Sequence, residues 1–192
     1  MYFFKERLRQ IMRSMGIILF SGWLAISPNH ATAAVLTFKN EKTKKVQLLI
    51  KNNNMNLSDD DVEQIASAHI LASEKYGINL ATGLAISFKE STFYPSAVSY
   101  DGVSVGLMMV NRKVWIPKLK LDRIKLREDV HYNVDAGYRI LKIYQDLYGQ
   151  DQGIKKYRGS VHQSTNTKYY NSIMSLKAKF EKWLVFDPEP AG

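Results

Sequence analysis

Apolar side chains recur at three- and four-residue intervals over much of the chain after Ser58, which is the spacing of one face of an α-helix. The clearest such segment runs from about Glu128 to Tyr148 and is closed by Gly149. Its apolar stripe comprises Val130, Val134, Gly137, Tyr138, Leu141, Tyr144 and Leu147. This pattern predicts a long helix with one face in the core.

Further helices are indicated by capping residues and by shorter apolar patterns. Ser58 and the three aspartates after it predict a helix start, and Gly77 a helix end, because a hydroxyl caps free N–H groups and acidic residues suit the positive end of a helix. Asn79 predicts the start of the next helix. One more is expected after Gly106, and a last one over about residues 168–183. Because no segment shows convincing strand alternation, we expect an all-α, lysozyme-like helical domain over 58–185 and a tail over 186–192.

The N-terminus has the pattern of a signal peptide. Basic residues precede an apolar stretch at 15–26, and Ala31-Thr32-Ala33 provides small residues for a cleavage site. A helix of that length is too short for a hydrocarbon core of ~30 Å at ~1.5 Å per residue. We therefore predict a signal peptide over 1–33 and export to the periplasm, with a retained N-terminal anchor as the alternative. The lysine-rich segment 34–57 is predicted to be a flexible tether.

Composition narrows the possible functions. The formal net charge is +9, which suits anionic surroundings, but the basic residues are dispersed and no nucleic-acid motif is present, so nucleic-acid binding is not expected. The chain has no cysteine, which excludes disulfides and thiolate catalysis. The histidines lack metal-ligand spacing, and neither a metal nor another cofactor is expected.

Glu90 is the candidate with a chemical rationale. It lies at the end of an apolar helix, where the helix dipole disfavours ionisation, and Phe88, Phe93 and Tyr94 would desolvate it in the same direction. A carboxyl group that stays protonated near neutral pH can donate a proton to a glycosidic oxygen. Position alone, however, favours a solvated glutamate in a frayed last turn.

Several sequence motifs, in order, change that balance. Residues 90–99 read Glu-Ser-Thr-Phe-Tyr-Pro-Ser-Ala-Val-Ser, and residues 106–111 read Gly-Leu-Met-Met-Val-Asn. An Asn, a Gly and a Tyr-Leu pattern follow at 133–141, then Tyr157 with Gly159, and then two tyrosines at 169–170. This succession resembles the soluble lytic transglycosylase family, relatives of goose-type lysozyme, over about residues 60–180.

The resemblance implies a lysozyme-like helical fold and an activity on the glycan strands of peptidoglycan. It implies that Glu90 acts first as the general acid and then as the base. The residues expected to bind substrate are Ser99, Met108, Met109, Tyr157, Tyr169 and Tyr170. Of these, Met108 is expected to form core and cleft wall, together with Leu107. One of the two adjacent tyrosines lines the cleft and the other packs, and the sequence does not distinguish them.

Two departures keep alternatives open. Met109 stands where the family has Gln, and Arg158 where it has Asn after the tyrosine. A hydrolytic muramidase on the same scaffold would require a second carboxylate, for which Asp101 is the candidate in the loop after Glu90. A peptidoglycan-binding scaffold protein with weak or no activity is the other alternative. A secretion, conjugation or pilus apparatus is a further expected partner, and membrane contact is expected only through the signal segment.

Overall fold

The structure is a computed structural model that describes the backbone of residues 28–159 and 163–185, and side chains within 40–159 and 164–185. Most of the predicted signal peptide and all of the predicted tail lie outside the described residues. Contacts divide the chain between Phe38 and Lys39, and the unit from Lys39 onward contains the helical domain. Within the described segments, no helix combines the length and apolarity needed to cross a membrane.

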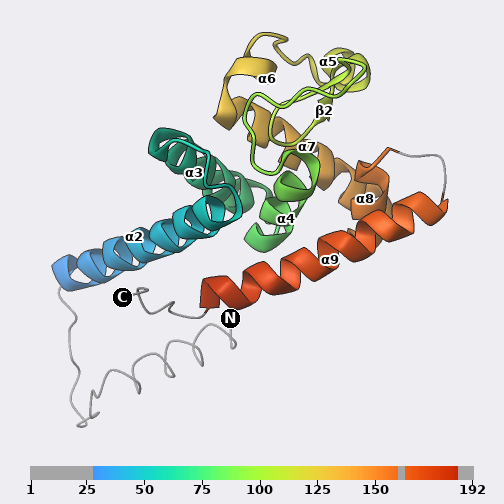
Figure 1. Ribbon diagram of the computed structural model, residues 1–192. Coiled ribbons are helices and arrows are strands. Elements are labelled where there is room, and N and C mark those ends of the chain that lie inside the picture. The colour runs from blue at the N-terminus through green and yellow to red at the C-terminus, as the bar shows by residue number, and fades with distance from the viewer. Residues whose placement is uncertain (1–27, 160–162, 186–192) are drawn as a thin grey trace. The chain divides into compact units, whose positions relative to one another are not determined.

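The described residues form an all-α fold, as predicted. Its helices are α2 (Pro28–Asn53), α3 (Asp59–Tyr76), α4 (Leu80–Ser91), α5 (Arg112–Leu119), α6 (Lys125–Glu128), α7 (Val130–Tyr148), α8 (Gln150–Tyr157) and α9 (Gln163–Val185). Two short strands, β1 (Ser104–Val105) and β2 (Val110–Asn111), pair antiparallel between α4 and α5. Figure 1 shows this succession of elements.

Capping explains where the helices begin and end. The Ser58 side chain accepts a hydrogen bond from the Asp61 N–H at 3.1 Å, and Gly77 adopts the left-handed conformation with φ of 63° after α3. Asn79 caps α4 and Asp129 caps α7 in the same way. The predicted helix boundaries at Ser58, Gly77 and Asn79 are therefore confirmed.

The core lies between α4, α7 and the helices packed on them. Helix α7 contacts α3 and α8, while α4 contacts α3 and α9. Gly83 of α4 leaves room for the Tyr138 side chain of α7, because a β-carbon there would lie 1.7 Å from the Tyr138 Oη. Leu147, expected in the apolar stripe of α7, is 66% exposed, so the buried face of that helix ends before its last turn.

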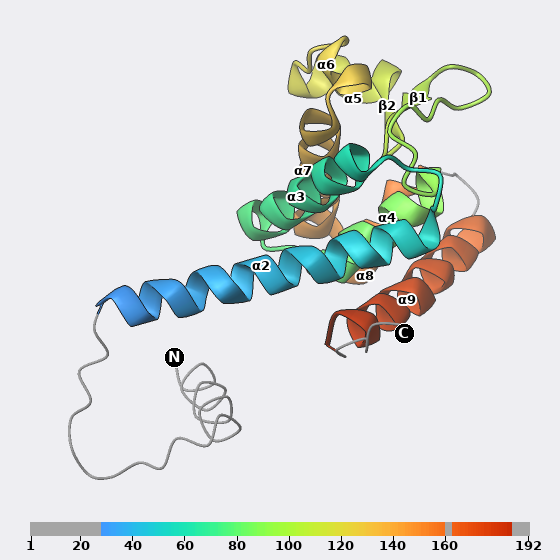
Figure 2. The same ribbon diagram turned by 60° about the vertical axis from the view of Figure 1, so that its left-hand side comes forward.

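The predicted tether is wrong for the residues that the structure describes. Residues 40–53, which were expected to be flexible, belong to helix α2. The side chains of Val46, Leu49 and Ile50 are at most 1% exposed. This part of α2 runs beside α3 (Figure 2) and is linked to it by ion pairs from Lys42 to Glu74 and from Lys51 to Asp59. The lysines flank the buried stripe of an amphipathic helix, and their number gives the segment the composition of a solvated linker.

The segment after Gly106 also differs from the prediction. A turn and strand β2 follow it, and α5 starts only at Arg112, where the Asn111 side chain accepts from the Val114 N–H at 3.0 Å. Val105 pairs with Val110 in a ribbon of two-residue strands. Strands this short show no alternation in sequence, and for this reason the sequence does not indicate them.

Candidate active site

Glu90 lies in the last turn of α4, just before an unusual backbone conformation. The helix is closed by the Thr92 N–H, which donates to the Phe88 carbonyl at 2.8 Å. Thr92 and Phe93 both have positive φ angles, of 54° and 61°. Residues other than glycine rarely adopt this left-handed region, and such conformations persist only where surrounding contacts enforce them.

Two contacts hold the turn after Glu90. Phe93 is fully buried, with its ring 5.6 Å from that of Phe88 and 6.5 Å from that of Phe180. The Asn54 Nδ2, just beyond the end of α2, donates to the Thr92 carbonyl at 2.9 Å. The position of Glu90 is thus fixed by residues from both ends of the domain sequence, including the segment expected to be a tether.

Tyr169 of α9 is the direct partner of Glu90. Its hydroxyl donates to the Glu90 Oε1 at 2.7 Å, and the tyrosine is only 5% exposed. Burial raises the pKa of the Glu90 carboxyl. The hydrogen bond from Tyr169 and the charges of Arg158 and Lys89 lower this pKa, but by less than burial raises it. Glu90 therefore keeps its proton to higher pH than an exposed glutamate.

A turn formed by residues 106–109 lies against the end of α4. The Leu107 carbonyl accepts hydrogen bonds from the Ser91 Oγ at 2.9 Å and the Ser87 Oγ at 3.4 Å. The Met108 carbonyl accepts one from the Tyr157 Oη at 2.8 Å. These bonds tie the turn to α4 on one side and to α8 on the other, so the backbone beside Glu90 has little freedom.

Asn133 of α7 fixes the same turn from beneath. Its Nδ2 donates to the Val105 and Leu126 carbonyls at 3.0 and 2.8 Å, and its Oδ1 accepts from the Met108 N–H at 2.9 Å. Gly106, with φ of 76°, passes so close that a β-carbon would lie 2.1 Å from the Asn133 Nδ2. Buried polar groups need such partners to offset the cost of leaving water.

Several of these supporting residues were not predicted as site residues. They are Asn54, Ser87, Ser91 and Asn133. Asn133 carried a usable signal, since a polar residue directly before Val134, on the apolar stripe of a predicted helix, is expected to have buried partners. Ser91 belongs to the Glu-Ser motif that resembles the family, whereas Ser87 carried no signal, because serine is common on either face of a helix.

The adjacent methionines have different environments. Met108 is fully buried, and a β-carbon on Gly137 would lie 2.5 Å from its own, so its side chain is part of the core beneath the turn and is not exposed to a substrate. Met109 is half-buried and has a φ of 44°. Of the two, only Met109 has a side chain that solvent reaches.

The adjacent tyrosines are also distinguished. Tyr169 contacts Glu90, whereas the ring of the half-buried Tyr170 lies 5.0 Å from the Lys155 Nζ of α8. Tyr157 contacts the turn at Met108 through its hydroxyl, and burial is the main cause that raises the pKa of that hydroxyl, with the Glu90 charge as a further cause. Tyr157 and Tyr169 therefore surround the catalytic candidate from α8 and α9.

Ser99 and Asp101 form a separate cluster in the loop before β1. The Ser99 Oγ donates to the Asp101 Oδ1 at 2.5 Å and accepts from the Ser104 N–H at 2.8 Å, and the Val103 N–H also donates to Asp101. These bonds, first that from Ser99, lower the pKa of the exposed Asp101. Among the described residues, neither side chain forms a hydrogen bond with Glu90.

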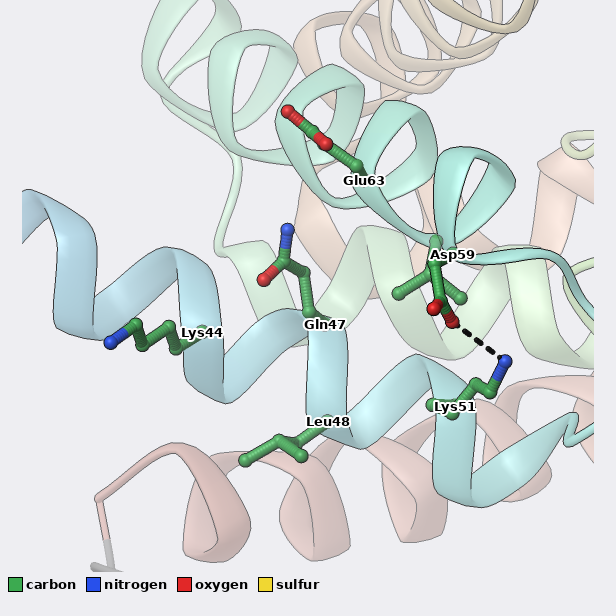
Figure 3. Close-up of a pocket in the computed structure, with 7 residues that line it drawn as sticks. Lys44, Gln47, Leu48, Lys51, Asp59 and Glu63 are labelled. Carbon is green, nitrogen blue, oxygen red and sulfur yellow. Dashed lines mark hydrogen bonds and ion pairs between the residues drawn. The ribbon is translucent and has the colours of Figure 1, made fainter.

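A cavity of about 380 Å³ lies elsewhere, between α2 and α3 (Figure 3). Lys44 and Lys51 contribute positive charge from α2, and Asp59 and Glu63 contribute negative charge from α3. The Lys51 Nζ lies 2.9 Å from the Asp59 Oδ1. Charge in this cavity is balanced, and it is not lined by any residue of the Glu90 cluster, by which we mean Glu90, Tyr157, Tyr169 and the turn at 106–109.

The Glu90 cluster is arranged for proton transfer. It combines one carboxyl group of raised pKa, one tyrosine hydroxyl at 2.7 Å that can stabilise the ionised form, and a turn held by hydrogen bonds. Such a group can give a proton to a leaving oxygen and take one back afterwards. Within the described part of the chain, no group of three or more His, Asp or Glu side chains is placed to hold a metal ion.

A comparison with protein families gives a match. Residues 67–175 match the family model described as Transglycosylase SLT domain. The matched range contains Glu90, the turn at 106–109, Asn133, Tyr157 and Tyr169. No curated protein and no solved structure matches the chain.

Proposed function

The chain belongs to the transglycosylase SLT domain family, whose members are lytic transglycosylases that act on peptidoglycan, and we propose that it cleaves the β-1,4 bond between N-acetylmuramic acid and N-acetylglucosamine. The product is a strand ending in 1,6-anhydro-N-acetylmuramic acid. Glu90 is the general acid and base. The observation that carries this proposal is the half-buried carboxyl group of Glu90, whose pKa is raised by burial and which accepts a hydrogen bond from Tyr169 at 2.7 Å.

Two steps complete the proposed reaction. Glu90 first donates its proton to the glycosidic oxygen while the bond from that oxygen to the anomeric carbon breaks, and the N-acetyl oxygen of muramic acid stabilises the carbon. The Glu90 carboxylate then accepts the C6 hydroxyl proton as the C6 oxygen bonds to the anomeric carbon. Water is not consumed, and ring closure is intramolecular, which favours it entropically.

Tyr169 has a role in both steps. Its hydroxyl donates to Glu90 at 2.7 Å, so it stabilises the carboxylate that exists between the two proton transfers. Burial stabilises the neutral acid and the tyrosine stabilises the anion, and a group that must alternate between the two forms benefits from a pKa between the extremes.

The hydrolytic alternative needs a second carboxylate that activates water. Asp101 is exposed and has hydrogen bonds from Ser99 and Val103 within its own loop, where it serves the turn. The scaffold alternative rests on Met109 and Arg158, but the partnership of Glu90 with Tyr169 is of use to an enzyme and of little use to a passive binder. Both observations favour the lytic transglycosylase.

Export is a further part of the proposal. The family acts on peptidoglycan, which in a bacterium lies outside the cytoplasmic membrane, and residues 1–33 have the signal-peptide pattern. Protein recovered from the periplasm should begin within a few residues of Ala34. A mature protein that retains Phe20 and Trp23 would instead support a membrane anchor. A secretion, conjugation or pilus apparatus as the partner stays a prediction.

Product analysis tests the proposed reaction. Purified peptidoglycan is digested with the protein, with Glu90→Gln as the control, and the soluble fragments are analysed by mass spectrometry. The proposal predicts muropeptides ending in the 1,6-anhydro sugar, lighter by one water than the products of hydrolysis. Reducing-end muramic acid as the main product would overturn the lyase and make the protein a muramidase.

A further inference from the structure

A second cavity, here called the ribbon pocket, lies between the loop that carries β1 and helix α5, and its volume is about 430 Å³. This is within the range of small-ligand sites. Its lining includes three cationic side chains (Arg112, Lys113 and Arg123), one carboxylate (Asp101) and an apolar wall formed by Ile116 and Pro117. Its composition is that of a site for an anionic group with apolar substituents.

Arg112 is held in place before any ligand arrives. Its backbone N–H donates to the Val103 carbonyl at 3.0 Å, and its guanidinium group donates to the Gly102 carbonyl. The side chain is half-buried. A guanidinium group offers five N–H donors in a fixed plane, so the remaining donors of a fixed arginine are oriented for a carboxylate.

The positive charge of the ribbon pocket is only partly neutralised by its own residues, because three cations face one carboxylate, Asp101, whose charge interacts with Lys113. The Asp101 carboxylate is engaged by Ser99 and Val103. Lys113 and Arg123 are exposed and, in the residues that the structure describes, neither has an ion pair within 4.0 Å. The cavity between α2 and α3 differs, since two carboxylates balance its two lysines there (Figure 3).

The ribbon pocket lies a few residues along the chain from the turn at 106–109, here called the catalytic turn. The Gly106 N–H donates to the Ala97 carbonyl at 2.7 Å, and the Leu107 carbonyl accepts a hydrogen bond from the Oγ of Ser91, the residue next to Glu90. Val103 at the pocket precedes Gly106 by three residues of the ribbon, a separation of ~10 Å at ~3.3 Å per extended residue. A stem peptide of several residues, attached to a glycan strand that passes the turn at 106–109, is longer than that distance.

We propose that the ribbon pocket binds a carboxylate of a stem peptide on the glycan strand that is being cleaved. This inference rests on the proposed function. The amino sugars of peptidoglycan carry no charge once the muramic lactyl group is amidated, so the ionised carboxylates of the substrate belong to its peptides. Ile116 and Pro117 give the methyl groups of alanine residues an apolar surface.

The experiment compares two forms of one substrate. Glycan strands with their stem peptides, and the same strands after an amidase has removed the peptides, are digested by the wild type and by Lys113→Glu/Arg123→Glu. The variant should lower the ratio of kcat/KM on peptide-bearing strands to kcat/KM on bare strands by roughly tenfold, which corresponds to one charge-assisted contact, mainly through KM. Added salt should lower the wild-type ratio.

The matched control is Lys125→Glu/Lys179→Glu, which makes the same change of charge at exposed positions outside the pocket. Its ratio should remain at the wild-type value. An equal loss on both substrates by the pocket variant, or an equal fall in ratio for the control, would overturn the proposal. If charge reversal prevents folding, Lys113→Gln/Arg123→Gln replaces the pocket variant, and it should lower the same ratio of kcat/KM values by a smaller factor.

A binding measurement separates this inference from the proposed function. A soluble stem tetrapeptide is titrated into Glu90→Gln protein, and the amide resonances of Gly102 and Lys113 are followed by NMR. Saturable shifts that the pocket variant weakens support the site even if the wild type cleaves neither substrate, a result that would overturn the proposed activity alone. Absence of saturable shifts at Gly102 and Lys113 would overturn the site.

Discussion

Two carboxyl groups, at the end of α4 and in the loop before β1, have opposite surroundings. Glu90 is half-buried with Tyr169 as its partner, and burial raises its pKa. Asp101 is exposed, and hydrogen bonds from Ser99 and Val103 lower its pKa. Near neutral pH, the first group can be a proton donor, whereas the second is an ionised acceptor that stabilises a turn.

The difference teaches that proximity in sequence says little about catalytic use. Both groups lie in the stretch that resembles a family active site. At Glu90, desolvation disfavours the charged form of the carboxyl group. At Asp101, hydrogen bonds to the charged form favour it. The backbone differs as well, since Glu90 is followed by a strained turn held by Phe93 and Asn54.

Removal of the acid should have the largest effect. Glu90→Gln keeps the shape of the side chain but cannot exchange a proton, and we expect kcat to fall by at least ~10²–10⁴-fold. Because burial raises the pKa of Glu90, ionisation of that carboxyl lowers stability as pH rises through the pKa. The Gln variant should therefore be as stable as the wild type, or more so, at neutral pH, as measured by thermal unfolding. Near-wild-type release of fragments would show that the acid is another residue.

Removal of the partner hydroxyl should have the next largest effect. Tyr169→Phe takes away the donor to Glu90, and we expect kcat to fall by about 10- to 100-fold, because the intermediate carboxylate loses a hydrogen bond to a charged group. The pKa of Glu90 should rise further, so the alkaline limb of the activity profile should move to higher pH. Tyr170→Phe is the matched control, with a change below about twofold. Equal effects of the two substitutions would contradict the assignment.

How much of this could be predicted from sequence differs from residue to residue. Glu90 could be identified because the motifs that follow it resemble those of a known family, whereas its position alone favoured a solvated glutamate. The two tyrosines could have been separated, because Tyr169, Ile173 and Phe180 share one helical face by their spacing, and the latter two are at most 1% exposed. Tyr170 is out of phase with that face.

Other features had weaker signals. The buried face of α2 is a few apolar residues among lysines, so composition suggested a linker where periodicity would have suggested a helix. Strands β1 and β2 are two residues each, too short for any pattern. The bonds of Ser99 depend on the exact path of one loop, which propensity does not determine.

Asp101 should matter little for the reaction. Asp101→Asn keeps the size of the side chain and removes the charge, and we expect kcat/KM on bare glycan strands to change by less than about threefold, since no step of the proposed reaction uses this group. The products should still end in the 1,6-anhydro sugar. A loss comparable with that of Glu90→Gln would make Asp101 the second carboxylate of a hydrolase.

Met109 should give the smallest effect. Met109→Gln restores an amide at a half-buried position of the catalytic turn, where the methionine can only accept weakly. Turnover of peptidoglycan should stay the same or rise by up to roughly tenfold, because the amide can add at most one neutral hydrogen bond to the sugar. The glutamine side chain has one heavy atom more than methionine, and position 109 is only half-buried, so thermal stability should be close to that of the wild type. A sharp fall in activity in a folded variant would show that the turn binds substrate differently.

The most direct test of the central claim is a titration of both carboxyl groups in one sample. Protein labelled with ¹³C at the side-chain carboxyls of Glu and Asp is followed by NMR against pH, with Glu90→Gln and Asp101→Asn used to assign the resonances. The account predicts that the pKa of Glu90 lies above the ordinary value of a glutamate and that the pKa of Asp101 lies below the ordinary value of an aspartate. A Glu90 that ionises at or below its ordinary pKa would contradict its role as the acid.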